Sequence, residues 1–159
     1  MISRFNQRGI AAVEFALIAT LLMVMLLGIL VYWRAFQAQQ SLTRAAGDGA
    51  RAVLSLIDAN NPCISAPELA ATHRENIRHG LEQTVRRTLE QSSMPGLVSQ
   101  RLTIGALDWS AACPSNGSTS SVIFHLSYQL PSLLITTIPI ISELDRISEK
   151  SVVHFASLL

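Results

Sequence analysis

The stretch "RGIAAVEFALIATLLMVMLLGILVYW", residues 8–33, decides the architecture of this 159-residue chain. From residue 15 to residue 33 it contains no charged side chain. As a helix, those residues would be about 28 Å long, close to the thickness of the bilayer core. Because lipid offers the backbone no hydrogen bonds, the stretch predicts a membrane-spanning helix. Glu14, near its start, is its one acidic residue.

The rest of the chain predicts a single span with one large domain beyond it. The next apolar stretch, residues 130–141, is interrupted by Pro131 and Pro139 and is too short to cross a bilayer. The leader before the span carries Arg4 and Arg8 and no acid. The positive-inside rule therefore predicts a cytoplasmic N-terminus and a C-terminal domain on the other side of the membrane.

Charge and cysteine content describe the domain beyond the span. Apart from Arg4, Arg8 and Glu14, the chain has ten basic and ten acidic residues, so we expect no nucleic-acid partner. It has two cysteines, Cys63 and Cys113. Outside the cytoplasm two such cysteines most often form a disulfide, while two separate buried thiols are the alternative.

Residues 35–56 predict that the first helix continues past the membrane. They are rich in Ala, Gln, Leu and Arg, which favour helices. The expected core-facing stripe is Phe36, Leu42, Ala46, Ala50, Val53 and Leu54. Gly47 and Gly49 each cost a helix about 1 kcal/mol relative to Ala. They indicate either close packing or a bend, or they are tolerated weak positions.

The remainder predicts a second helix and then a small sheet. A helix is expected over residues 67–91, with Leu69, Ile77, Leu81, Val85 and Leu89 on its apolar face. Hydrophobic and polar residues then alternate over 102–106 and, most clearly, over 122–130, and a third strand is expected near 147–155. Such a sheet needs a helix against it to be stable, so the fold class is α+β, with about three antiparallel strands.

The apolar segment 130–141 needs a cover of some kind. It either wraps over the domain's own core or contacts a partner subunit or the membrane surface. In the second case the contacting side chains would be Leu133, Leu134, Ile135 and Ile138.

No catalytic or metal-binding motif is present in the sequence. His73 and His79 are six residues apart, not at the spacing of a helical zinc site, and no HExxH, GxSxG or phosphate-binding glycine loop occurs. We therefore expect no enzymatic activity, no metal and no cofactor.

The residues around Glu14 resemble a prepilin-type cleavage site. A short basic leader ends in Gly9, apolar Ile10 follows, and Glu14 is the fifth residue after the glycine, ahead of Phe15. With the "AAGDGAR" stretch at residues 45–51, the segment resembles the TadE-like pseudopilins of the tight-adherence (Flp) pilus system. An ordinary secretory signal is disfavoured, because its apolar core would be shorter.

The resemblance implies a structural role in pilus assembly. A prepilin peptidase would cut between Gly9 and Ile10 on the cytoplasmic face of a bacterial inner membrane. The parts would be a leader (1–9), the helix with its extension (10–57) and an extracytoplasmic domain (58–159). Partners would be the peptidase, other pilin and pseudopilin subunits and the inner-membrane assembly platform, with Glu14 and Phe15 acting in assembly. The alternative is an uncleaved single-pass anchor that carries a protein-binding module of another envelope complex.

Overall fold

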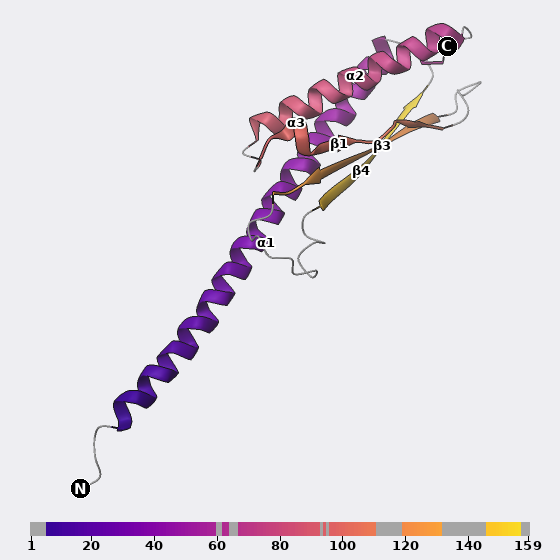
Figure 1. Ribbon diagram of the computed structural model, residues 1–159. Coiled ribbons are helices and arrows are strands. Elements are labelled where there is room, and N and C mark those ends of the chain that lie inside the picture. The colour runs from indigo at the N-terminus through magenta and orange to yellow at the C-terminus, as the bar shows by residue number, and fades with distance from the viewer. Residues whose placement is uncertain are drawn as a thin grey trace. The chain divides into compact units, whose positions relative to one another are not determined.

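The computed structural model describes residues 6–59, 62–63, 67–92, 94, 96–110, 119–131 and 146–156 (Figure 1). The chain divides into two compact units, Met1–Phe36 and Gln37–Leu159. One helix, α1 (Asn6–Ala59), contributes to both units.

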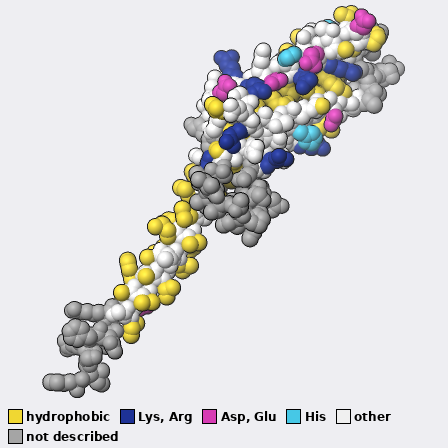
Figure 2. Space-filling view, viewed as in Figure 1, with side chains coloured by type: hydrophobic (Ala, Val, Ile, Leu, Met, Phe, Trp, Pro, Cys, Tyr) yellow, Lys and Arg dark blue, Asp and Glu magenta, His cyan; other side chains and the backbone are white. Residues whose placement is uncertain are grey.

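In the N-terminal unit, α1 is apolar on every side. Large hydrophobic side chains from Ile10 to Trp33 are exposed around the helix, and Figure 2 shows them in yellow. A helix that is hydrophobic all round belongs in a protein core or in lipid, and no described residue covers this one. By length and composition α1 can cross a membrane, as the sequence predicted.

In the C-terminal unit, α1 turns one stripe into the core. The buried side chains are Ala38, Leu42, Ala45, Ala46, Val53 and Ile57. The prediction is confirmed for Leu42, Ala46 and Val53, whereas Ala50 is only half-buried. It is wrong for Leu54, which is 39% exposed, because one step from Val53 to Leu54 rotates a side chain by about 100°. It is also wrong for Phe36, which is 46% exposed and is the last residue of the N-terminal unit.

The second helix, α2 (Pro67–Gln91), has the predicted bounds and packs against the extension of α1. Ile77, Leu81, Val85 and Leu89 are fully buried, as predicted. Leu69 is 53% exposed, so that prediction is wrong, and Ala70 is buried in its place.

The two helices approach closely at two glycines, one on each helix. A Cβ atom added to Gly49 would lie 2.8 Å from Leu81 Cδ1 and 2.9 Å from Val85 Cγ2. A Cβ atom added to Gly80 would collide with Leu56. Gly47, in contrast, has open space around it. Gly49 therefore permits close helix packing, whereas α1 makes no such use of Gly47.

An antiparallel sheet follows the helices, with β3 (Thr119–Gln129) at its centre. β4 (Arg146–Ala156) pairs with β3 along its whole length, from Thr119↔Ala156 to Gln129↔Arg146. Two short strands pair with β3 as well, β1 (Leu102–Ile104) and β2 (Asp108–Trp109). Because a strand has two edges, β1 and β2 share the edge that β4 leaves open. The α+β prediction is confirmed, with four strands rather than about three.

A β-bulge separates β1 from β2. Ile104 lies opposite Leu126, whereas Asp108 lies opposite Ile123, so this edge contains one residue more than β3 does. The Gly105 N–H still donates to the His125 carbonyl, which places the extra residue just after Gly105. The predicted strand 102–106 therefore ends early, at Ile104, and β2 was not predicted. A short helix, α3 (Val98–Arg101), was also not predicted.

The helices cover one face of the sheet. Four β3 side chains on that face, Val122, Phe124, Leu126 and Tyr128, are completely buried, as their alternation predicted. A Cβ atom on Gly49 of α1 would lie 3.7 Å from Phe124, and the Arg74 guanidinium of α2 lies 5.5 Å from the centre of the Trp109 ring. Figure 1 shows both helices on this side of the strands. The opposite face carries mainly polar side chains, such as Ser121, His125 and Lys150, together with the Ile123↔Val152 pair.

Candidate processing and assembly site

The residues of the prepilin-like motif lie together on one face of α1. Gly9, Ile10, Val13, Glu14 and Leu17 line an open groove along the helix surface. Their spacing explains this, since helical residues three or four apart share a face. Glu14 is therefore one turn from Ile10 and points to the same side. Glu14 is exposed, and Ile10 is 68% exposed.

Phe15 lies next to this groove, and the described residues leave it uncovered. It is 73% exposed, the most exposed of the large hydrophobic side chains that the structure describes. Together, Ile10, Glu14 and Phe15 make an apolar surface with one carboxylate in it. A surface of this composition is suited to a second apolar helix that offers a positive charge.

The start of α1 is a weak helix terminus. α1 begins at Asn6 and has no acidic residue in its first turn, where a carboxylate would stabilise the helix dipole. The sequence places cationic Arg8 there instead, followed by Gly9, a poor helix former. The Gly9–Ile10 bond thus lies in a part of α1 that unwinds at low cost.

The structure describes Cys63 but neither its expected partner nor the expected contact residues of the segment 130–141. Cys63 lies half-buried in a turn after α1, and it is not a free thiol. Cys113 lies outside the described residues, as do Leu133, Leu134, Ile135 and Ile138. The pairing of the cysteines and the partner surface therefore stay predictions.

Within the described part of the chain, no group of three or more His, Cys, Asp or Glu side chains could hold a metal ion. His79 lies on α2 with Nε2 3.4 Å from Glu75 Oε1, which is a surface pair one turn apart. His125 and His154 are exposed on β3 and β4.

Comparison with known proteins adds one finding. Residues 9–51 match the model of the TadE-like protein family. The match starts at Gly9 and ends at Arg51, so it covers Ile10, Glu14 and Phe15 and extends through Gly49. No curated protein and no solved structure matches the chain. Residues 9–51 are thus a TadE-like segment, as the sequence around Glu14 indicated.

Proposed function

We propose that the chain is a minor pilin-like subunit that takes part in assembling a tight-adherence pilus. The observation that carries this proposal is the exposed carboxylate of Glu14, one turn from Ile10 on an apolar helix of membrane-spanning length. The TadE-like match over the same residues supports it. The subunit would have no catalytic role of its own.

Processing is the first step of the proposed function. A prepilin peptidase at the cytoplasmic face of the inner membrane would cut between Gly9 and Ile10. Proteases act on unwound chain more readily than on intact helix. The absence of an acid from the first turn, together with Gly9, lowers the cost of unwinding residues 6–10.

Cleavage would change the surroundings of Glu14. In the uncut chain the helix begins two turns before Glu14, too far for its dipole to favour the carboxylate. After cleavage the helix would begin at Ile10, whose new α-ammonium group would lie one turn from Glu14. The pair offsets charge within one subunit. Between two subunits, the Glu14 carboxylate on one helix and the ammonium on the next would fix their axial register.

This register matters because a charge in lipid is costly without a partner. A carboxylate at the centre of a spanning helix costs roughly 3 kcal/mol. A neighbouring pilin that supplies an ammonium group recovers part of that cost only when the helices are correctly aligned. Glu14 would thereby select the aligned contact, and Phe15 would pack beside it.

The other parts of the proposal concern topology and the outer domain. The leader (1–9) would be cytoplasmic, the helix and its extension would occupy 10–57, and the domain (58–159) would lie outside the inner membrane. Cys63 would pair with Cys113, the one other cysteine in the chain. Residues 133–138 would contact the assembly platform, another pilin or the membrane.

The second candidate function is an uncleaved anchor for a module of another envelope complex. The observation that favours it is the continuity of α1, which is helical across the Gly9–Ile10 bond. In that case the spacing of Gly9 and Glu14 would have no role.

The test is the N-terminal sequence of the membrane form. The protein is expressed with and without an active prepilin peptidase and sequenced from its first residue. The proposal requires Ile10 with the peptidase and the intact leader without it. If the protein keeps its leader both with and without the peptidase, it is an uncleaved anchor.

A further inference from the structure

A small polar pocket lies at one end of the sheet, apart from the motif on α1. Its volume is about 180 Å³. Six polar residues of α3, β1, β3 and β4 line it, namely Gln100, Arg101, Thr103, Ser127, Gln129 and Arg146. Among the described residues of the lining there are two guanidinium groups and no acid, which is the composition of an oxyanion site.

The backbone around the pocket positions Arg101. Gly96 has a φ of 100°, a conformation that side-chain-bearing residues rarely adopt. A Cβ atom on Gly96 would lie 3.1 Å from both Cδ and Nε of Arg101. The bare glycine therefore makes room for the stem of this side chain. Nη1 of Arg101 also lies 3.4 Å from the Gln129 carbonyl oxygen, which draws the guanidinium toward β3.

Arg146 enters the pocket from the other edge of β3. It is the first residue of β4 and lies directly opposite Gln129. Because opposed residues of antiparallel strands point to the same face, Arg146, Gln129 and the neighbouring Ser127 share the face that the helices leave uncovered. Among the described residues, neither Arg101 nor Arg146 has an acidic partner within 4.0 Å.

The pocket lies at the end of the C-terminal unit at which the first residue of that unit, Gln37, is found. α2 runs antiparallel to α1, since Gly80 meets Leu56 and Val85 meets Gly49. The C-terminal end of α2 therefore lies toward Gln37, the first residue of this unit. α3 and β1 follow α2 directly, and they bring Gln100, Arg101 and Thr103 to that same end.

We propose that this pocket binds the phosphate of an anionic phospholipid headgroup. Two guanidinium groups can donate paired N–H hydrogen bonds to phosphate oxygens, and the hydroxyls of Thr103 and Ser127 and the side-chain amides of Gln100 and Gln129 can donate to the remaining oxygens. We favour a lipid as the source of this phosphate, because the apolar, membrane-length part of α1 is joined to this unit at Gln37. That covalent link keeps the local concentration of lipid around the domain high. The inference holds for a cleaved pilin and for an uncleaved anchor alike.

The test uses the full chain in nanodiscs that contain equal parts of phosphatidylglycerol and phosphatidylcholine. The lipids that stay bound to the ejected protein are counted by native mass spectrometry. The wild type should retain phosphatidylglycerol over phosphatidylcholine. Arg101→Gln/Arg146→Gln should reduce that preference about tenfold, since it removes both charged donors. Equal retention by the wild type and this double variant would overturn the proposal.

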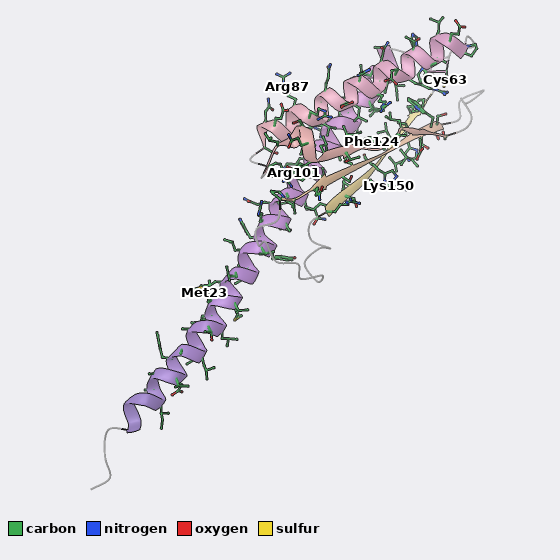
Figure 3. All side chains as sticks on the ribbon, viewed as in Figure 1. Met23, Cys63, Arg87, Arg101, Phe124 and Lys150 are labelled. Atoms are coloured by element: carbon green, nitrogen blue, oxygen red, sulfur yellow. The ribbon has the colours of Figure 1, made fainter. Side chains whose placement is uncertain are left out.

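Lys150→Gln is the matched control. Lys150 lies on β4, is exposed and carries the same charge as Arg146, but it does not line the pocket (Figure 3). Its removal should leave the lipid preference unchanged, and an equal loss here would show general attraction to a basic face, against the proposal. If the double variant does not fold by circular dichroism, Arg146→Gln alone replaces it, with an expected loss of about threefold.

A second arm separates lipid from a free anion. Inorganic phosphate is added at millimolar concentration to the wild type in phosphatidylcholine nanodiscs, and the side-chain Nε–Hε signal of Arg101 is followed by NMR. If inorganic phosphate shifts this signal much less than phosphatidylglycerol nanodiscs do, the result supports binding of the lipid headgroup. Saturation of the shift by inorganic phosphate would assign the pocket to a soluble oxyanion and overturn the lipid assignment.

Discussion

Gly49 of α1 lies directly against Leu81 of α2, so closely that a methyl group on the glycine would stand 2.8 Å from Leu81 Cδ1. Both residues are buried at the centre of the contact between the helices. Two residues earlier on the same helix, Gly47 has no atom within 4 Å of the same position. The pair makes a natural comparison between a glycine that packing requires and one that it does not.

Gly49→Ala should destabilise the domain, and Gly47→Ala should not. The added methyl group at residue 49 overpacks the contact, which typically costs roughly 1–3 kcal/mol, and the gain of about 1 kcal/mol in helix propensity leaves a net loss of up to about 2 kcal/mol. At residue 47 the same change should be neutral or stabilise by up to about 1 kcal/mol. Thermal unfolding of the full chain in a non-ionic detergent, followed by circular dichroism, measures both. Equal unfolding temperatures for the two variants would contradict the close contact.

Gly9→Leu should leave the leader attached in cells with an active prepilin peptidase. A bulky side chain at the residue before the scissile bond would obstruct its entry into the peptidase site. Gly28→Ala is the control, since Gly28 lies on the same helix with nothing within 4 Å and should be processed normally. Immunoblots separate precursor from mature chain, and N-terminal sequencing identifies the new end. Efficient removal of the leader from Gly9→Leu would show that the cut is elsewhere.

Glu14→Ala should insert into the membrane and be cleaved at least partly, but assemble poorly with partner pilins. Insertion becomes easier because the carboxylate is absent, by less than the roughly 3 kcal/mol of a charge at the centre of the span, since Glu14 lies near its start, while the proposed register contact is lost. Glu14→Asp, one methylene shorter, should be intermediate. Thr20→Ala also removes a polar group from the membrane-length part of α1. The Thr20 hydroxyl already donates to the Leu17 carbonyl, so assembly should be unaffected by its loss.

Assembly is measured as pilus formation, or as co-purification with partner pilins, at matched protein levels. Wild-type assembly by Glu14→Ala would remove the register role from the glutamate. Loss of assembly by Thr20→Ala to the same extent would point to a general requirement for polarity in the segment.

Cys63 and Cys113 should be joined in the exported protein. A disulfide between them closes a loop of about 50 residues, which the chain-entropy model values at around 4 kcal/mol of stability. Reduction should therefore lower the unfolding temperature, and the Cys63→Ser/Cys113→Ser variant should show the lower value with or without reductant. Mass spectrometry under non-reducing conditions checks the bond directly. Two alkylatable thiols in the exported protein would contradict the pairing.

The sequence predicted those elements whose burial follows a regular period. β3 alternates between buried and partly exposed residues along its length because one face packs on the helices, and this pattern was visible from Val122 to Tyr128. In α2, Ile77, Leu81, Val85 and Leu89 recur every four residues for the same reason. The motif around Glu14 could be identified because its chemistry depends on local spacing alone.

Other features depend on contacts between distant residues, which periodicity does not report. Leu69 and Leu54 are apolar residues beside a buried stripe, and only the position of the partner helix decides which neighbour is covered. Arg101 and Arg146 are far apart in sequence and meet because β1 and β4 pair with opposite edges of β3. The sequence predicted a strand from residue 102 onward, next to Arg101, but it gave no strand register with which to bring Arg146 beside that residue.

The bulge between β1 and β2 makes this edge of the sheet tolerant of the loss of one residue. Deletion of either Ala106 or Leu107 would leave a single residue opposite Phe124 and make the ladder regular, with Asp108 still opposite Ile123 and Trp109 still opposite Val122. Trp109 would therefore stay on the core face, where its ring meets Phe155 at 6.2 Å. Related chains should accordingly include some with one residue fewer between β1 and β2, and an alignment gap at this place would mark a sheet without the bulge rather than a different sheet.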